Sequence, residues 1–401
     1  MIRRLVALAA AGLLLILATS PASAAPGDLD RTYSGDGITK AGFYRGGNSI
    51  LVDSQGKVLV GGIHSTNDRP ALLRYKANGA LDTTFSGDGK TTLPTLGGVT
   101  DLAWHQSKIL VLVDSTLFRL NLNGAIDKTY GGGDGQVQLG RVAVALGTYG
   151  ANVFALQEPR NNWSQWVSRA QGEQITELLL PRPDGGSADF PGWYKDLATS
   201  PAGESLYVTG WTESDPNDGQ ELAVLSKVPS GVGPATGEWT RYADPQNSST
   251  EGNALAVSPT NGNVVVIGTL WGDYSDGYAG FFMRVSPSGE TVTERVFRGQ
   301  VARDGYTDSW DIAAAYSVAL AGGGKTIVGG YTHMEEDFGS DPPYESALTV
   351  WRLNNDGSLD QTFGTGGYVR TPGAGDLAFA VAVSTTKIVA AGNQYTARYL
   401  G

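Results

Sequence analysis

The fold is decided by a stretch that reads SILVDSQGKVLVGG from Ser49 to Gly62. Two apolar runs flank a turn that is rich in polar residues and Gly, which is typical of a short antiparallel hairpin. Six further copies follow at a spacing of about 50 residues, at 101–113, 142–156, 197–210, 254–268, 317–330 and 381–392. Seven such units predict an all-β fold, a seven-bladed β-propeller.

Two features recur beside the hairpin. A third strand follows, and it carries a basic residue near its end: Arg74, Arg119, Arg169, Lys227, Arg284, Arg352 and Arg398. A signature, G-x-(L/I)-D-x-T-(F/Y), stands at 27–33, 79–85, 124–130 and 357–363. We expect the signature aspartates to pair with these arginines as scaffold and the signature glycines to adopt positive φ. These aspartates are Asp30, Asp82, Asp127 and Asp360.

The two ends of the chain predict how the ring closes. The last unit stops at Gly401, directly after its third strand, and lacks the signature segment that follows other units. That segment, Gly27 to Gly37, stands near the start of the chain instead. We therefore expect the N-terminal segment to complete the seventh blade, which leaves no free sheet edge.

These units resemble the delta-60 repeat family of bacterial secreted and surface proteins. The resemblance rests on Ala254-Leu255-Ala256-Val257-Ser258-Pro259 and on Gly79-Ala80-Leu81-Asp82-Thr83-Thr84-Phe85, with worn copies from about Gly140 to Val301. It implies a propeller fold, and it brings no catalytic residue or ligand.

Composition and termini set the environment and the partners. Residues 1–24 read as a signal peptide, with two early arginines, an apolar run and Ala22-Ser23-Ala24 at the end, so we expect an exported propeller domain over 25–401. There is no Cys, which excludes disulfides and thiol catalysis. Without the signal segment the formal charge is 27 − 40 = −13, which disfavours nucleic acid and anionic membranes as partners. No later segment is apolar enough for membrane insertion.

The units differ most in the loops between their second and third strands. These are short in units two and seven but long in units four, five and six, where each begins with an aromatic residue and continues into carboxylates. Trp163, Trp193 and Trp310 can project to the same face. Departures from a repeat are where function is expected. The candidate ligand-binding residues are Trp211, Asp215, Trp271, Asp273, Tyr274, Asp276, Tyr331, His333, Glu335 and Glu336.

Three interpretations of this face stay open. In the first, aromatic planes and carboxylates bind a cell-envelope glycan, an exported protein or a cationic ligand. In the second, carboxylates such as Asp273 and Glu335 make the protein a hydrolase or lyase acting on an extracellular carbohydrate or lactone. In the third, the aromatic residues only cap the gaps between blades and the protein is a passive surface module.

Enzyme and cofactor motifs are mostly missing. The sequence has no G-x-S-x-G elbow and no phosphate-binding loop, and His333 is not part of an H-E-x-x-H motif, so we assign no catalytic residue and favour a non-enzyme. No cofactor is expected apart from a calcium candidate in Asp215-x-Asn217-x-Gly219 or Asp273-x-Ser275-x-Gly277. Neither continues to the last acidic ligand of an EF-hand.

Overall fold

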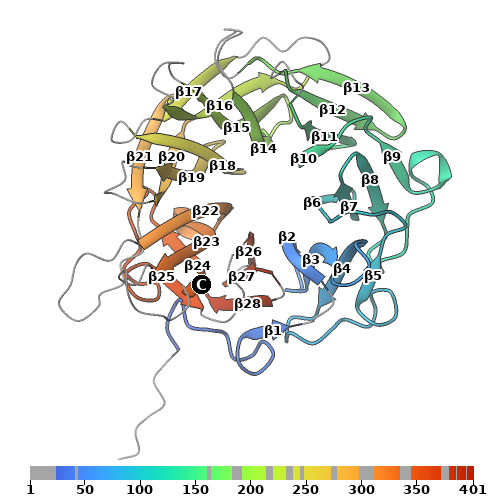
Figure 1. The fold of residues 1–401 in the computed structure, drawn as a ribbon, viewed down its shortest axis with the longest axis horizontal. Helices are drawn as coiled ribbons and strands as arrows, with labels where there is room; N and C mark the ends of the chain where they lie inside the picture. The colour runs from blue at the N-terminus through green and yellow to red at the C-terminus, as the bar shows by residue number, and fades with distance from the viewer. Residues whose placement is uncertain are drawn as a thin grey trace, which may run out of the picture.

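The computed structural model describes residues 24–40, 44–159, 164–182, 192–213, 220–231, 238–243, 248–271, 278–297, 311–334, 345–371, 379–384, 386–393 and 395–401. Within these ranges the chain forms seven four-stranded antiparallel sheets around a common axis (Figure 1). The prediction of an all-β, seven-bladed β-propeller is confirmed. The expected signal segment lies outside the described residues, except for Ala24.

The blades follow one another along the chain. Blades 1 to 3 contain β2 (Tyr44–Val52), β3 (Val58–His64), β4 (Pro70–Tyr75) and β5 (Lys90–Thr92); β6 (Asp101–His105), β7 (Lys108–Val113), β8 (Thr116–Leu120) and β9 (Gln136–Gln138); β10 (Ala143–Tyr149), β11 (Asn152–Gln157), β12 (Trp166–Gln171) and β13 (Gln174–Leu179). Blades 4 and 5 contain β14 (Gly192–Thr199), β15 (Ser205–Glu213), β16 (Glu221–Pro229) and β17 (Trp239–Ala243); β18 (Ser249–Val257), β19 (Val264–Trp271), β20 (Tyr278–Val285) and β21 (Thr291–Phe297). Blades 6 and 7 contain β22 (Asp311–Leu320), β23 (Thr326–Met334), β24 (Glu345–Leu353) and β25 (Tyr368–Thr371); β26 (Ala380–Ser384), β27 (Lys387–Ala391), β28 (Tyr395–Leu400) and β1 (Ile38–Lys40).

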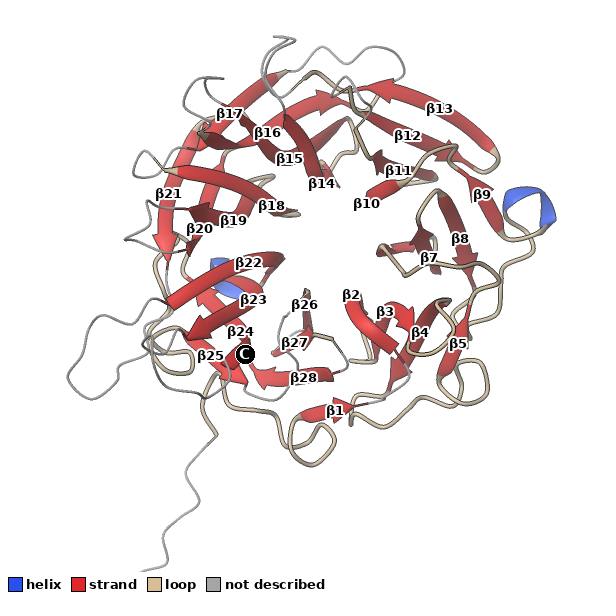
Figure 2. Cartoon of the chain, viewed as in Figure 1, coloured by secondary structure: helices blue, strands red, loops and turns tan. Residues whose placement is uncertain are grey.

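Helix is confined to two short 3₁₀ turns within the described ranges, Gly131–Gly133 and Gly322–Gly324 (Figure 2). In the same part of the chain, no helix has the length and apolarity to cross a membrane.

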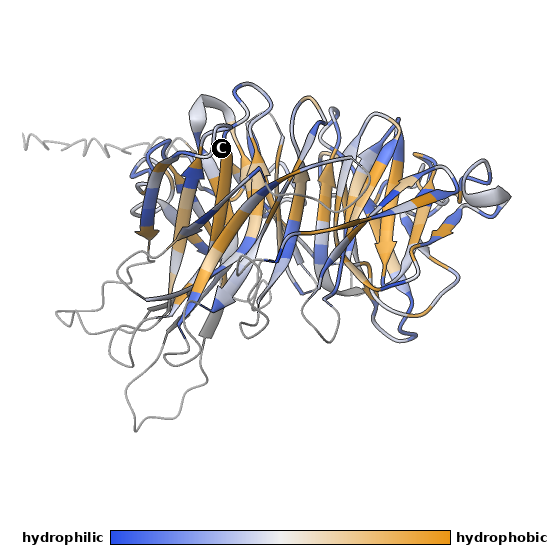
Figure 3. Cartoon of the chain, turned by 90° about the horizontal axis from the view of Figure 1, so that it is seen from above, coloured by the Kyte–Doolittle hydropathy of each residue, from blue (hydrophilic) through white to orange (hydrophobic). Residues whose placement is uncertain are grey.

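The apolar runs are continuous because the middle strands are buried on both faces. In β3, Leu59 packs into a core shared with blade 2, whereas Val58 and Val60 pack into a core shared with blade 7. Alternate side chains of one strand therefore serve two neighbouring blades, as the two-residue period of a strand requires. Figure 3 shows the result as apolar strand centres between more polar ends.

The ring closes as the chain ends predict. Strand β1 pairs with β28 in antiparallel register, with Thr39 opposite Thr396. The amide of Asp30 donates to the carbonyl of Arg398 at 2.8 Å, and the amide of Leu400 donates to the carbonyl of Asp28 at 2.9 Å. The first and last segments thus share one sheet, with β1 as its outer strand (Figure 1).

The predicted Arg–Asp pairs are present in all four signature units. Arg74, for example, donates its Nε–H to Asp82 at 2.9 Å, and Lys57 from the start of the second strand contacts the same carboxylate at 2.9 Å. Burial opposes ionisation of Asp82, but the hydroxyl of Thr84, the ammonium of Lys57 and the charge of Arg74 outweigh it and lower its pKa. The equivalent pairs are Arg119–Asp127, Arg352–Asp360 and Arg398–Asp30. The four signature glycines have positive φ, as expected.

The worn units hold their basic residue by other partners. Lys227 pairs with Glu238 at 2.7 Å, and Arg169 donates to the side-chain oxygen of Asn152 at 3.0 Å. In these two units the basic residue of the third strand is therefore held by a different acceptor, a glutamate or an asparagine.

The first strands, nearest the axis, present a sheet edge whose amides are partly satisfied by the preceding blade. Asp101 accepts a hydrogen bond from the amide of Leu146 in blade 3, and Asp196 accepts one from Leu255 in blade 5, both at 2.8 Å. Burial raises the pKa of Asp101 to about 6 and that of Asp196 to about 7, against the opposing effect of these amides. These carboxyls link blades along the inner edge of the ring.

Candidate functional site

The structure describes three of the ten candidate residues in full. Trp211 lies two residues before the end of β15, Trp271 is the last residue of β19, and Tyr331 lies in β23. His333 is placed only as a residue of β23. The remaining candidates, together with Trp163, Trp310 and both calcium candidates, lie outside the described residues: Asp215, Asp273, Tyr274, Asp276, Glu335 and Glu336.

Two of the three, Trp211 and Trp271, line one open cleft between blades 4 and 5. It has a volume of about 560 Å³ and lies at the ends of the strands from which the long loops start. Its lining residues come from five strands and are Trp193, Lys195, Trp211, Glu221, Ser249, Glu251 and Trp271.

Strand register brings the tryptophans to this place. Trp193 and Trp211 are cross-strand partners on β14 and β15, and their rings meet edge to face with centroids 5.0 Å apart. Trp211 is only 8% exposed, so it supports Trp193 from behind and is not itself an open platform. Trp271 is half-buried opposite Ser249 in blade 5. Trp193 and Trp271 therefore supply the accessible aromatic surface.

The polar part of the cleft comes from the inner strands. β14 and β18 each carry a β-bulge, and the extra residues are Lys195 and Asn253. The ammonium of Lys195 lies 2.5 Å from a carboxylate oxygen of Glu251 and 3.3 Å from the side-chain oxygen of Asn253. Asn253 donates in turn to the carbonyl of Ala315 at 3.0 Å. Neighbouring blades are thus joined by one polar chain at the rim.

Glu221 is the second carboxylate of the cleft. Burial raises its pKa, and the charges of Glu251 and Glu213 raise it further, whereas Lys195 opposes the change. Its amide donates to the hydroxyl of Ser249 at 3.1 Å. The cleft therefore offers a charge-neutralised carboxylate, Glu251, and a carboxyl group that is more readily protonated, Glu221.

Tyr331 belongs to an aromatic pair in the next blade, outside the cleft lining. Its ring stacks on that of Tyr316 with centroids 5.9 Å apart, and Tyr316 is 37% exposed. Burial raises the pKa of Tyr316 to about 12, and the charges of Tyr331 and Glu251 act in the same direction. In the described residues, blades 4, 5 and 6 thus each contribute at least one of these aromatic side chains.

Four lining residues escaped the sequence-based prediction: Lys195, Glu221, Ser249 and Glu251. Three of them precede the repeated apolar motif of an inner strand, and Ser249 and Glu251 belong to the polar run at 244–253. A usable signal is Trp193, an aromatic residue shortly before the apolar motif of unit four, whose cross-strand partner in β15 is Trp211.

The described residues do not meet the requirements of a metal site. Among these residues there is no group of three or more His, Asp or Glu side chains that could hold an ion. What the cleft presents instead is two aromatic faces, hydrogen-bond acceptors and a lysine donor.

The fold and the cleft define a β-propeller with an aromatic cleft between two blades. Residues 54–85 and 344–363 match a family described as a β-propeller domain of unknown function, DUF5122. This match supports a family of propeller repeats. No curated protein matches the chain.

Solved structures also resemble the chain. The WD40 domain of Neurospora crassa Pan2 is 10% identical, with 89% of each chain covered and a TM-score of 0.50. Saccharomyces cerevisiae Sqt1 is 9% identical over 90% of this chain and 97% of its own, with a TM-score of 0.46. Kuenenia stuttgartiensis hydrazine synthase is 12% identical over 88% and 75%, with a TM-score of 0.43. At these identities, the first likeness supports the propeller fold alone.

Proposed function

We propose that this chain is an exported β-propeller that binds a cell-envelope glycan in the cleft between blades 4 and 5. The observation that carries the proposal is the pair of half-buried rings, Trp193 and Trp271, which flank a polar lining in a cleft of about 560 Å³. Sugar rings present apolar faces for stacking and hydroxyls for hydrogen bonding, and this lining supplies counterparts for both.

The charge balance favours a neutral glycan over a cationic ligand or an acidic one. Lys195 lies 2.5 Å from Glu251 and neutralises its charge, which leaves Glu221 as the one remaining acidic residue of the lining. A cation would require free carboxylates, and an anion would meet two glutamates. Export is proposed on residues 1–24, and the signature segments support assigning the repeats to the delta-60 family.

Binding is tested by co-sedimentation with insoluble envelope polysaccharide from the host cell. Trp193→Ala and Trp271→Ala are each expected to weaken retention about tenfold or more, because a buried aromatic anchor contributes roughly 2 kcal/mol to an interface. Tyr149→Ala is the matched control, since Tyr149 is 42% exposed in the hairpin of blade 3 on the opposite face. Equal retention of all four proteins would contradict the proposal.

A hydrolase or lyase is the second candidate, and Glu221 is the specific reason for it. A carboxyl group with a raised pKa beside a second carboxylate is the arrangement that acid–base cleavage of a glycoside uses. Glu221→Gln is then expected to abolish release of reducing ends while polysaccharide retention stays. Absence of reducing ends with the wild type, over long incubation, would leave binding as the function.

A further inference from the structure

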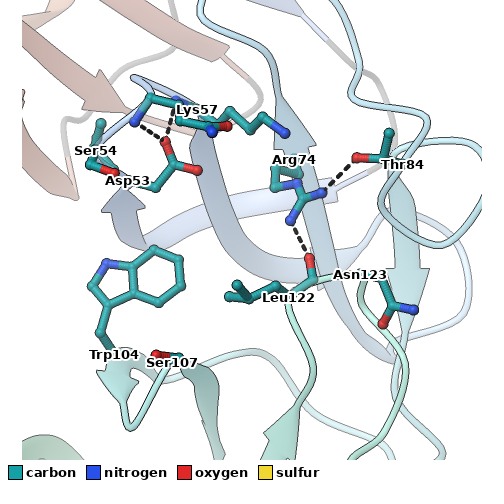
Figure 4. Close-up of a pocket in the computed structure, with 11 residues that line it drawn as sticks. Asp53, Ser54, Lys57, Arg74, Thr84, Trp104, Ser107, Leu122 and Asn123 are labelled. Atoms are coloured by element: carbon teal, nitrogen blue, oxygen red, sulfur yellow. Dashed lines mark hydrogen bonds between the residues drawn. The ribbon is translucent and has the colours of Figure 1, made fainter.

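A second cleft lies between blades 1 and 2, on the face opposite the tryptophan cleft. Its volume is about 710 Å³, within the range of small-molecule sites. One wall is the turn from Asp53 to Lys57, and the other carries Trp104 at the end of β6 and Leu122 in the turn after β8 (Figure 4). Arg74 and Thr84 lie between the walls (Figure 4).

The neighbouring gap between blades 7 and 1 shows what the repeat builds by default. There, strand register puts Val52 where blade 2 has Trp104, and the unit carries Ala77 where blade 2 has Leu122. That cleft has a volume of only about 290 Å³. If Trp104 and Leu122 filled the cleft between blades 1 and 2, that cleft would be smaller than the one between blades 7 and 1. It is larger, at about 710 Å³ against about 290 Å³. Trp104 and Leu122 therefore extend its walls.

These two side chains remain accessible. Leu122 is 48% exposed and Trp104 is half-buried. The hairpin that follows Trp104 is tight, because Gln106 and Ser107 both adopt positive φ in a two-residue turn between His105 and Lys108. Blade 2 thus presents a short turn beside the five-residue turn of blade 1, which keeps the mouth of the cleft open.

The charged groups of the cleft balance in number, because Lys57 and Arg74 are accompanied by the carboxylates of Asp82 and Asp53. Arg74 and Lys57 share a single carboxylate, Asp82, which is 1% exposed, and both lie 2.9 Å from it. Arg74 also donates to the hydroxyl of Thr84 at 2.9 Å and to the carbonyl of Leu122. Asp53 is occupied by its own turn, where it accepts the amides of Gln55 and Lys57. The side chain of Lys57 is 26% exposed and that of Arg74 is 10% exposed, so the ammonium of Lys57 is the charge that a ligand can reach.

We infer that the cleft between blades 1 and 2 is a second ligand site, for a small molecule with a planar apolar ring system and an acidic group. The ring would lie against Trp104 and Leu122, and the acid would contact Lys57. The rest of the lining is fixed, because Arg74 ties the turn of blade 2 to blade 1. This inference is independent of the glycan proposed for the other face.

Two fluorescent probes test the site. 1-Anilinonaphthalene-8-sulfonate combines planar rings with an acid, and N-phenyl-1-naphthylamine has similar rings and no charge. Titration of the folded protein, with stoichiometry from calorimetry, is expected to give one sulfonate site per chain. Trp104→Val and Leu122→Ala introduce the residues that stand at the equivalent positions of blade 1, Val52 and Ala77, so both variants are expected to fold. Each is expected to weaken sulfonate binding about tenfold.

The controls separate this site from others. Trp271→Ala alters only the cleft on the far face and is expected to leave the sulfonate affinity unchanged. Lys57→Gln is expected to weaken the sulfonate severalfold and the neutral probe little, and circular dichroism reports whether the variant keeps the fold. The inference is overturned if the wild type binds neither probe, or if Trp104→Val and Leu122→Ala bind the sulfonate as the wild type does. Equal affinity for both probes would overturn the acidic requirement.

Discussion

Replacing Asp30 by Asn is expected to loosen the joint that closes the ring while the other blades stay packed. Asp30 is 3% exposed and comes from the N-terminal segment, whereas Arg398 and Lys387 come from the last two strands of the chain. Arg398 lies 2.8 Å from its carboxylate, Lys387 lies 3.1 Å away, and the hydroxyl of Thr32 donates to it at 2.7 Å. One carboxylate thus holds together segments from opposite ends of the sequence.

The size of the effect follows from the pKa of Asp30. Burial alone would raise that pKa, but the hydrogen bonds from Thr32, the ammonium of Lys387 and the charge of Arg398 lower it from 3.8 to about 2. Such a lowering corresponds to roughly 2 to 3 kcal/mol of stabilisation of the folded protein at neutral pH. Asn keeps the shape and loses the charge, so opening of the joint should become on the order of 50-fold more frequent.

Amide hydrogen exchange measures this opening directly. In Asp30→Asn, peptides covering 27–40 and 395–401 are expected to exchange on the order of 50-fold faster than in the wild type. Asp82→Asn is the matched control, because Asp82 makes the same contacts inside blade 1 and should accelerate peptides covering 79–92 instead. Unchanged exchange of the terminal peptides in Asp30→Asn, or equal acceleration there by both variants, would refute the reasoning.

Two further outcomes follow from individual side chains. Asp101 and Asp196 have raised pKa values in the folded protein, so their contribution to stability is full below about pH 4 and is lost as pH rises through about 6 to 7. Tm should therefore fall between about pH 4 and 7. Asp196→Ser should make this fall smaller. Gly79→Ala should destabilise more than Gly87→Ala by denaturant titration, by about 1 kcal/mol or more. Both glycines have positive φ, but only at Gly79 would a Cβ lie 2.7 Å from the amide nitrogen of Ser34 in the neighbouring blade.

The ring, its seven blades and its closure could be predicted because each is written locally and repeatedly. The hairpin at Ser49 to Gly62 fixes its own turn and two strands, and the same pattern recurs often enough to be counted. The pairing of Asp82 with Arg74 was likewise within reach, since the two residues stand eight positions apart in one unit. Local rules suffice where partners are neighbours in sequence.

The clefts were harder to predict because they lie between blades. Lys195 meets Glu251 across 56 positions of sequence (251 − 195), and Lys195 is the extra residue of a β-bulge in β14. The aromatic residues at the strand ends were visible as departures from the repeat, yet Trp211 turned out to support Trp193. Tyr331 pairs with Tyr316 within blade 6, outside the cleft between blades 4 and 5. The sequence indicated which strand ends carry aromatic residues. The strand register then showed which of these residues line the cleft between blades 4 and 5.

The position of both clefts has an energetic cause. The middle strands must satisfy two cores at once, so a changed side chain such as Leu59 would disturb packing in blades 1 and 2 together. At the strand ends a side chain contacts one neighbour and water, and exposed substitutions there cost little. Trp104 in place of a valine and Leu122 in place of an alanine are changes of this kind. A propeller can therefore acquire binding sites at the rims between blades without altering the interactions that close the ring.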